Sequence, residues 1–257
     1  MQHERRLMDS ENMHFLSDKK RFPVNHLPMS AVIMAGGFGA RLRPLTDNLP
    51  KPLLPIGERP IMELTVEQLR DAGIRRLYVT THYLPEKIMD HFGDGRSFGI
   101  KITYVREDNP LGTAGALGLI EKTDQSLLLI NGDIITKLDF RAMWAFHRVN
   151  KAALTVAVRQ HELQVPYGVM ESEGIYLRQV REKPRFSFLV NAGIYLLEPV
   201  ALGYIPAGER FDMTDLMQSM LHNRQMIANF PIPGYWLDVG RHADYKQAQK
   251  DFQDGKF

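Results

Sequence analysis

The chain has 257 residues, of which 44% are hydrophobic and 24% are charged, so it can bury one substantial core and is not typical of a disordered protein. Its 32 basic and 30 acidic residues give a formal net charge of +2, and neither sign forms a long block. A charged surface for nucleic acid or a membrane is therefore not expected. The absence of cysteine excludes disulfides, thiolate metal sites and cysteine nucleophiles, and favours a cytoplasmic location.

Charged residues interrupt residues 1–30 every few positions, which predicts no secretory signal, and no apolar run is long enough to span a membrane. From Ala31 onward the pattern changes to short β-rich runs that alternate with helical periodicity. We therefore expect residues 1–30 to form an N-terminal extension or linker, and residues 31–257 to form one domain.

This alternation predicts an α/β fold with a doubly wound, mostly parallel, Rossmann-like sheet and helices on both faces. Expected strands of the first half are residues 31–35, 76–80, 100–105 and 127–130. Expected helices are residues 60–73, between Pro60 and Gly73, and residues 85–92, 113–121 and 140–150.

The second half reads as strands with little helix between them, at residues 153–159, 167–171, 174–181 and 192–197. We expect antiparallel pairs among them, which would extend the sheet and form the floor of a second subsite. Helices are expected at residues 213–223 and 243–251.

The strongest motif is the glycine turn of residues 31–55, in which a buried strand leads into Gly36, Gly37 and Gly39. Glycine lets backbone N–H groups approach phosphate oxygens, because it has no Cβ. The motif is neither a Walker A loop nor a dinucleotide fingerprint, since it lacks Gly-Lys-Ser/Thr and since Pro44 disfavours a helix directly after the turn. A plain turn with solvated cations is the alternative.

Residues 36–46 (GGFGARLRPLT) and 50–61 (PKPLLPIGERPI) resemble the signature of the sugar-1-phosphate nucleotidylyltransferase family. The resemblance extends over roughly residues 31–250. It implies that Arg41 and Lys51 are catalytic and neutralise the α-phosphate and the departing pyrophosphate. It also places four residues of the turn at the nucleotide: Ala35, Gly36, Gly37 and Gly39.

Two aspartates stand in further blocks of this resemblance. Asp133 follows the apolar strand at the start of residues 127–136 (LLLINGDIIT). Asp238 lies in residues 235–245 (YWLDVGRHADY). Taken alone, Asp133 is more typical of a turn former than of a metal ligand, and Asp238 fits a helix-initiating residue as well as it fits a ligand. The resemblance implies that both aspartates hold Mg²⁺, which usually takes one or two protein carboxylates together with phosphates and water.

Other blocks match the substrate sides of the family. Residues 107–119 (EDNPLGTAGALGL) resemble the nucleotide-base and ribose segment and imply nucleotide binding by Glu107, Gly112 and Thr113, although Thr113 also suits a helix cap. Residues 165–170, 181–184 and 190–199 match the sugar side, although a solvated hairpin turn is the better explanation of the Glu-Lys-Pro sequence when those residues are taken alone. The implied sugar-phosphate residues are Gly168, Glu182, Lys183, Asn191 and Gly193.

A narrower resemblance, carried by residues 107–118, 131–140 and 230–245, is to nucleotidylyltransferases that follow a pair of CBS repeats, some of which are guanylyltransferases for amino-sugar phosphates. Thirty N-terminal residues are too few for such a pair of ordinary size, so a truncated chain and a lineage without the module both stay open, and regulation by adenylates is in question.

The sequence thus predicts an enzyme that transfers a nucleoside monophosphate from a nucleoside triphosphate, with GTP favoured, to a sugar-1-phosphate and releases pyrophosphate, with Mg²⁺ as cofactor. A uridylyl-, thymidylyl- or cytidylyltransferase stays open, as does an inactive nucleotide sensor on the same fold. A dehydrogenase is disfavoured, because no acidic residue ends a second strand about twenty positions after the glycines. A homo-oligomer is compatible with the sequence, whereas nucleic-acid and membrane partners are not expected.

Overall fold

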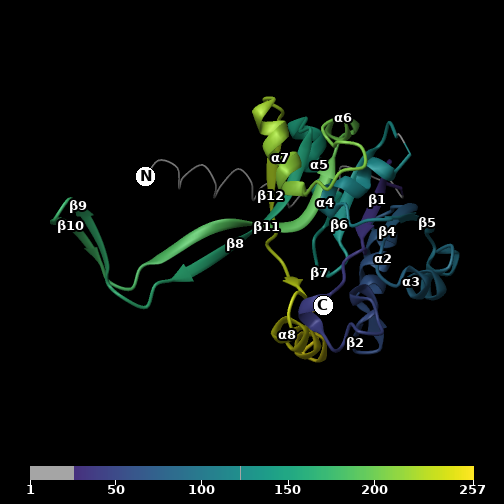
Figure 1. Cartoon of the computed structure of the whole chain (residues 1–257), viewed down its shortest axis with the longest axis horizontal. Helices are drawn as coiled ribbons and strands as arrows, with labels where there is room; N and C mark the ends of the chain where they lie inside the picture. Colours follow the sequence, from purple (N-terminus) through teal and green to yellow (C-terminus); the bar gives the residue numbers. More distant parts are fainter. Residues whose placement is uncertain (1–25, 122) are drawn as a thin grey trace.

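The computed structural model describes residues 26–121 and 123–257 (Figure 1). Most of the expected N-terminal extension, residues 1–25, lies outside the described residues. The first strand, β1 (Met29–Met34), begins two residues before the predicted Ala31. Its burial is almost complete, as expected for a central strand covered on both faces.

A seven-stranded sheet in the order β12-β8-β11-β6-β1-β4-β5 forms the centre of the molecule (Figure 1). Strands β6, β1, β4 and β5 run parallel, β11 is antiparallel to both of its neighbours β6 and β8, and β12 is parallel to β8. The predicted mostly parallel α/β fold is therefore confirmed. The other strands of the sheet are β4 (Arg76–Thr81), β5 (Lys101–Arg106), β6 (Ser126–Asn131), β8 (Leu154–Gln164), β11 (Arg185–Leu197) and β12 (Ile227–Pro231).

Helices cover both faces of the sheet, as the periodicity predicts. One face packs against α2 (Ile61–Asp71), α3 (Pro85–Phe92) and α5 (Phe140–Asn150), and the opposite face against α4 (Gly112–Gly115), α6 (Pro199–Leu202) and α7 (Met213–His222). Helix α8 (His242–Gln253) belongs to a third cluster that includes Leu42, Leu54 and Val239.

Local chemistry explains several of these boundaries. The Asp139 carboxylate accepts hydrogen bonds from the backbone N–H groups of Arg141 at 2.9 Å and Ala142 at 3.0 Å, which caps α5 as predicted. The same helix ends at Lys151, whose φ of 49° lies in the left-handed region.

The expected helix over residues 113–121 is instead a single turn, α4, followed by the 3₁₀ helix η5 (Ala116–Leu119). The N–H groups of Ala114 and Gly115 both donate to the carbonyl oxygen of Phe211 at 2.9 Å. Because these donors bond to a distant loop, and because glycine is a poor helix former, a regular helix does not continue here.

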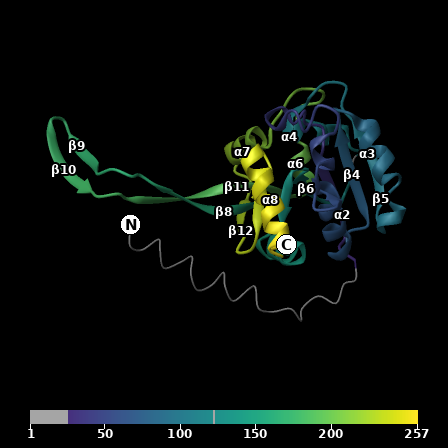
Figure 2. The same cartoon turned by 90° about the horizontal axis from the view of Figure 1, so that it is seen from below.

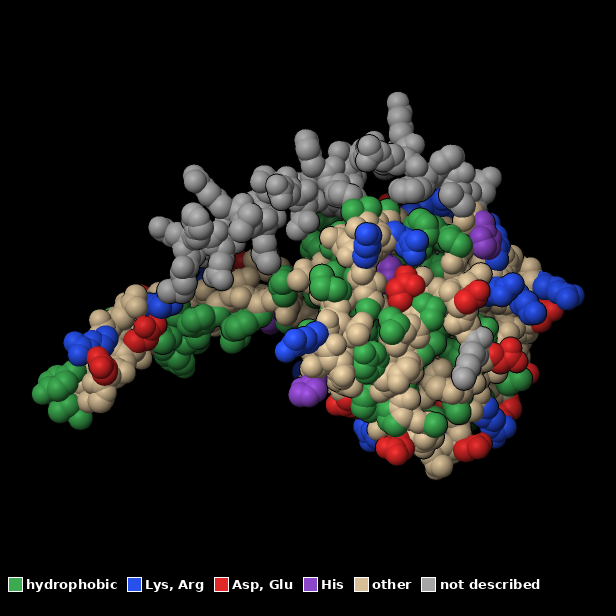
Figure 3. Space-filling model, turned by 90° about the horizontal axis from the view of Figure 1, so that it is seen from above, with side chains coloured by type: hydrophobic (Ala, Val, Ile, Leu, Met, Phe, Trp, Pro, Cys, Tyr) green, Lys and Arg blue, Asp and Glu red, His purple; other side chains and the backbone are tan. Residues whose placement is uncertain are grey.

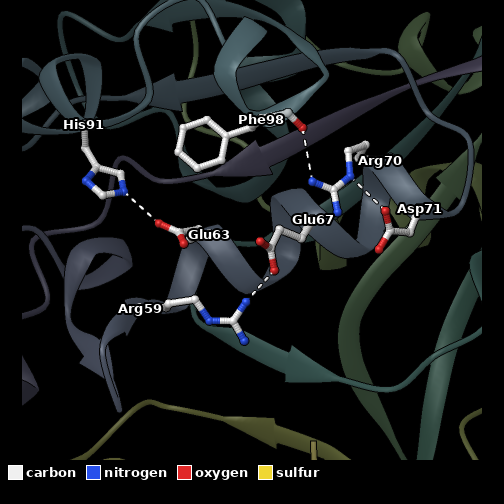
Figure 4. Close-up of polar contacts among 7 residues, drawn as sticks. All are labelled: Arg59, Glu63, Glu67, Arg70, Asp71, His91 and Phe98. Carbon is white, nitrogen blue, oxygen red and sulfur yellow. Dashed lines mark hydrogen bonds and ion pairs between the residues drawn. The ribbon is translucent and has the colours of Figure 1, made fainter.

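Polar contacts hold the exposed side of α2 to its surroundings (Figure 4). Arg59 donates to Glu67 at 2.6 Å, and Glu63 contacts His91 of α3 at 3.0 Å. These pairs are partly exposed, so we assign each of them only a small contribution to stability.

The pieces that the sequence pattern did not reveal are short and depend on distant partners. Strand β7 (Ile134–Thr136) pairs antiparallel with β13 (Trp236–Asp238), and β2 (Pro55–Ile56) pairs with β3 (Arg59–Pro60). Strand β12 was also missed, although it forms one edge of the main sheet.

Strands β8 and β11 continue far beyond the sheet as a two-stranded ribbon, with β9 (Val169–Glu173) and β10 (Tyr176–Arg181) at its far end (Figures 1 and 2). We call residues 159–190 the arm. The predicted antiparallel extension of the sheet is present, but β9 and β10 pair with each other and stand away from the sheet. The expectation that they form the floor of a second subsite in the body is therefore wrong for this conformation. In the described part of the chain, every helix is too short or too polar to cross a membrane.

Candidate active site

The candidate site lies at the carboxyl edge of the parallel strands, where β1 sits between β6 and β4. From here the chain runs in opposite directions along the sheet, from β1 to β4 and from β6 to β8, and at such a switch point α/β proteins have a crevice in which they bind ligands. The main-chain N–H of Ala35 donates to Thr80 and that of Gly132 to Met34, at 3.0 and 2.9 Å. The glycine turn and the Asp133 loop therefore start side by side.

The glycine turn is packed tightly at two of its glycines. A Cβ on Gly36 would lie 2.8 Å from Oε1 of Glu107, and one on Gly39 would lie 2.8 Å from Cγ2 of Thr46. Gly39 also has a φ of 62°, which an L side chain rarely adopts. Gly37 is exposed and has open space around it. The turn thus keeps free backbone at Gly37 between two tightly packed neighbours.

Both cations of the motif face the predicted carboxylates. Lys51, in the 3₁₀ helix η3 (Lys51–Leu53), donates from Nζ to Oδ2 of Asp133, and its side chain is only 11% exposed. A Cβ on Gly240 would lie 3.3 Å from Oδ1 of Asp238 and 3.7 Å from both terminal guanidinium nitrogens of Arg41. Arg41 and Asp238 therefore flank the same point.

The β7–β13 pair brings the two aspartates together from positions 105 residues apart in the sequence. Asp238 stands opposite Ile134 in this ladder, and the N–H of Val239 donates to the carbonyl oxygen of Asp133 at 3.0 Å. Burial and then the Asp133 charge raise the pKa of Asp238, while Lys51 and Arg41 oppose this shift. Two carboxylates in one partly buried site favour a bound cation.

Unpaired oxygens gather at the same place. Among the described residues, four buried side-chain atoms have no hydrogen-bond partner, and three of them are Oδ1 of Asn131, Asp133 and Asp238. No group of three or more His, Cys, Asp or Glu residues in the described chain forms a metal cluster. Two carboxylates with free oxygens nevertheless fit Mg²⁺, which keeps several water or phosphate ligands. The donor set does not fit a structural zinc site, which needs four protein ligands.

Glu107 closes the glycine turn from the end of β5. Its side chain is buried, and Oε2 accepts a hydrogen bond from the N–H of Leu111 at 3.0 Å. His82, after β4, contacts the Glu107 carbonyl oxygen at 2.8 Å through Nδ1. Glu107 thus sits under the turn and holds the start of the predicted base segment.

Thr113, next to Gly112, bonds to Asp212 and Met213, a contact that the sequence did not reveal. The Asp212 carboxylate accepts from the N–H of Thr113 at 2.9 Å, and the Thr113 hydroxyl donates to that carboxylate at 3.3 Å. Thr113 Oγ1 also accepts from the N–H of Met213 at 2.8 Å. Thr113 therefore does take part in capping a helix, as the alternative interpretation predicted. The helix is α7, however, and not the one expected over residues 113–121.

Asn191 and Gly193 lie at the root of the arm, next to the aspartate site. Gly193 has a φ of 71°, and a Cβ there would lie 2.7 Å from Nδ2 of Asn131. The indole N–H of Trp236 donates to the carbonyl oxygen of Ala192 at 2.8 Å. The predicted sugar-side residues of this block therefore adjoin the strand that carries Asp238.

Gly168, Glu182 and Lys183 do not join the site in this conformation. They lie together where the ribbon meets the β9–β10 hairpin, with Glu182 Oε2 at 3.2 Å from a Cβ built on Gly168. Lys183 has a φ of 43° and is 61% exposed, and its Nζ is 3.9 Å from Glu182. From the Val158–Asn191 pair to the Gln164–Arg185 pair the ribbon advances six residues, about 20 Å at ~3.4 Å per residue.

The comparisons with known proteins agree with this geometry. The sequence model of the family described as Nucleotidyl transferase matches residues 30–255. The chain belongs to this family. The family expectation from the glycine turn and the two aspartate blocks is therefore confirmed, whereas the narrower likeness to CBS-linked members stays a prediction.

Relatives within the family differ in nucleotide. The chain is 35% identical over 227 residues to the mannose-1-phosphate guanyltransferase of Schizosaccharomyces pombe, covering 84% of this chain and 62% of the relative. It is 34% identical over 242 residues to the UTP–glucose-1-phosphate uridylyltransferase of Synechocystis, covering 86% and 62%. The chain therefore spans less than two thirds of the length of these relatives.

Among solved structures, a candidate glucose-1-phosphate thymidylyltransferase from Bacillus anthracis, in complex with a sucrose, superposes with a TM-score of 0.72 at 28% identity. The match covers 89% of this chain and 97% of that one. This likeness supports the fold assignment over the whole body.

Two residues at the site were not singled out from the sequence. Asn131 directly precedes the Gly-Asp pair at the end of β6, and that position was a usable signal. Asp212 had no such signal, because its partner Thr113 is 99 residues away.

Glu107→Gln is expected to change how stability depends on pH. Burial raises the pKa of Glu107 above its ordinary 4.5, despite the Leu111 N–H and the His82 charge, so the folded state holds this proton more tightly than the unfolded state. At a pH above the pKa of Glu107 in the folded state, the ionised carboxylate therefore lowers the free energy of unfolding. This loss disappears as the pH falls toward the pKa of Glu107 in the unfolded state. Relative to the glutamine variant, the wild type should gain stability as the pH falls from neutral through the folded pKa toward the ordinary 4.5.

Urea unfolding of both proteins across this range measures the effect, and glutamine keeps an acceptor for the Leu111 N–H. The exposed Glu86→Gln is the matched control and should follow the wild type. Parallel profiles for wild type and Glu107→Gln would contradict a perturbed carboxyl at this position.

Proposed function

We propose that this protein is an enzyme that transfers a nucleoside monophosphate from a nucleoside triphosphate to a sugar-1-phosphate, giving a nucleotide sugar and pyrophosphate. The observation that carries the proposal is the convergence of Lys51 and Arg41 on Asp133 and Asp238, beside a glycine turn with open backbone at Gly37. A plain structural turn would not require two cations and two partly buried carboxylates with unpaired oxygens.

The chemistry needs little from protein acids or bases. A phosphate monoester has a second pKa near ~6, so the sugar phosphate is already an anionic nucleophile at neutral pH. Its oxygen attacks the α-phosphorus in line, and pyrophosphate leaves from the opposite side. The enzyme must therefore align the two anions and neutralise the charge that moves onto pyrophosphate.

Each side chain of the site has a role in this scheme. The free backbone of the glycine turn binds the triphosphate oxygens, and Arg41 and Lys51 offset the negative charge on the α-phosphate and the leaving group. Asp133 and Asp238 would hold Mg²⁺, which supplies Lewis-acid charge stabilisation when it is bound. Asn191 and Gly193, at the root of the arm, are placed to contact the sugar phosphate.

Pyrophosphate release measures the proposed reaction. Release should require a nucleoside triphosphate and a sugar-1-phosphate together, should depend on Mg²⁺, and should stop in excess chelator. Full activity in chelator would contradict the metal assignment. Release from the triphosphate alone would indicate a hydrolase in place of a transferase.

We further propose GTP as the preferred donor and an amino sugar or related hexose-1-phosphate as the acceptor. The similarity to the guanyltransferase of S. pombe and the likeness to CBS-linked members support this choice, while the uridylyltransferase of Synechocystis is almost as similar. A cytoplasmic location suits such substrates and the absence of cysteine.

The donor preference is expected to appear as a higher kcat/KM for GTP than for UTP, CTP, dTTP and ATP with one good acceptor. A wrong base leaves a buried hydrogen-bonding group of the site without a partner. This costs about 1–3 kcal/mol of binding free energy, which lowers the specificity for that base by one to two powers of ten. A clear preference for a pyrimidine donor would overturn the guanylyl assignment and leave the transfer reaction in place.

A further inference from the structure

The arm carries an unusual amount of exposed apolar surface. Nine of the 17 large hydrophobic side chains that are exposed in the described chain lie between residues 159 and 190. Figure 3 shows hydrophobic side chains gathered along one side of the arm and at its tip. The nine are Leu163, Tyr167, Met170, Ile175, Tyr176, Leu177, Val180, Phe188 and Leu189.

The ribbon has one apolar face and one polar face. Leu163 pairs with Phe186, and Phe188 pairs with His161, so these side chains share a face. The opposite face carries the pairs Gln164–Arg185, Glu162–Ser187 and Gln160–Leu189, in which Leu189 is the one large apolar side chain. A lone two-stranded ribbon is only marginally stable in water, and it needs cover on its apolar face.

The ribbon of the arm is fixed in direction where it leaves the body. Its ladder is continuous from the Gln164–Arg185 pair to the Val158–Asn191 pair, and the register shift in β11 lies nearer the body, between Asn191 and Tyr195. That shift is fixed to the site strand, because Trp236 donates to Ala192 at 2.8 Å. Arg159 also donates to the carbonyl oxygen of Gly234 at 3.1 Å. Folding the ribbon back at its root would break these bonds.

The apolar surface is large enough for a specific contact. Tyr167, Tyr176 and Phe188 are each more than half exposed, and an aromatic side chain offers about 150–250 Å². With the six aliphatic side chains, the arm carries apolar area of the order that a standard interface buries, about 800 Å² per partner.

We propose that the arm docks on a second copy of this chain, in a reciprocal arm exchange that brings Lys183 and Glu182 of one copy to the Lys51–Asp133–Asp238 site of the other. Such an exchange closes with two-fold symmetry and leaves no arm uncovered. It also explains why these two residues stand about 20 Å beyond the root of their own arm, at ~3.4 Å per residue. The catalytic half of this inference rests on the proposed function, whereas the docking of the arm does not.

Subunit complementation tests the exchange. Asp133→Asn damages the body site, and Lys183→Ala damages the arm and should raise the KM for the sugar phosphate far more than that for the triphosphate. The two variants, co-expressed with different tags and purified as a heterodimer, contain one undamaged site if the arm acts on the other copy. We expect about half of the wild-type activity at low sugar phosphate, because one of the two sites is intact. An arm that serves its own body leaves both sites damaged, so no recovery would overturn the proposal.

Two controls complete the test. A heterodimer of Asp133→Asn and Asp238→Asn has both changes in the body and should stay as weak as its parents if each site uses the aspartates of one chain. Light scattering should show a dimer for the wild type and a monomer for Phe188→Glu, while Val149→Glu, equally exposed but on α5, should stay dimeric. A monomeric, fully active wild type would refute the exchange. If no substrate pair releases pyrophosphate, the proposed function fails, and light scattering still decides whether the arm docks.

Discussion

Asp133→Asn and Asp238→Asn are each expected to lower turnover several hundredfold while the fold is retained. Each change removes a negative charge from a proposed Mg²⁺ ligand and keeps its shape, and Mg²⁺ binds through very few protein carboxylates. Burial and the neighbouring Asp133 raise the pKa of Asp238, so its ionised form costs the folded state stability at neutral pH. Asp238→Asn should therefore keep or raise the Tm in the absence of substrate, although activity falls.

Turnover at saturating substrates and thermal unfolding without substrate separate these two effects. Asp90→Asn, an exposed change on α3, is the matched control and should leave both quantities near wild type. Normal turnover in both site variants would return Asp133 and Asp238 to the roles of turn former and helix-initiating residue.

Lys51→Met is expected to reduce kcat by about 10²–10³-fold, the usual effect of removing one preorganised electrostatic donor. The Lys51 side chain is 11% exposed and contacts Asp133, so its charge acts in a partly dry site where neutralisation of the leaving pyrophosphate is strongest. The change also leaves the Asp133 carboxylate without its cation, which should lower the Tm. Lys51→Met and Asp238→Asn should thus shift the Tm in opposite directions.

Lys246→Met, an exposed change of the same chemistry on α8, controls for the loss of a lysine. Steady-state kinetics with both substrates varied should place the Lys51 effect mainly in kcat. An effect confined to the KM of the triphosphate would show that Lys51 serves binding alone and would contradict its role at the leaving group.

Much of the body could be predicted from the sequence, because the relevant signals are local. The buried run of β1, the apolar spacing of α2 between Pro60 and Gly73, and the Asp139 cap of α5 each depend on residues within a few positions. Asp133 stands two residues after the apolar strand β6, but its role as a Mg²⁺ ligand was implied by the family resemblance and not by this local pattern.

The details of the candidate site depend on partners that are far apart in the chain. The β7–β13 pair places Asp238 beside Asp133, and no local pattern marks three-residue strands. Similarly, the Asp212 carboxylate takes up the N–H and the hydroxyl of Thr113 from 99 positions away in the sequence. Such contacts are set by packing, which overrides local propensity.

The arm shows most clearly what the sequence by itself does not determine. Alternation within residues 153–197 determined that antiparallel strands form there, because side chains of a strand point alternately to its two faces. It could not determine whether those strands lie over the body or extend from it. Only the tertiary structure decided this, through the continuous ladder from the Val158–Asn191 pair to the Gln164–Arg185 pair and the bonds that fix its root to Trp236 and Gly234.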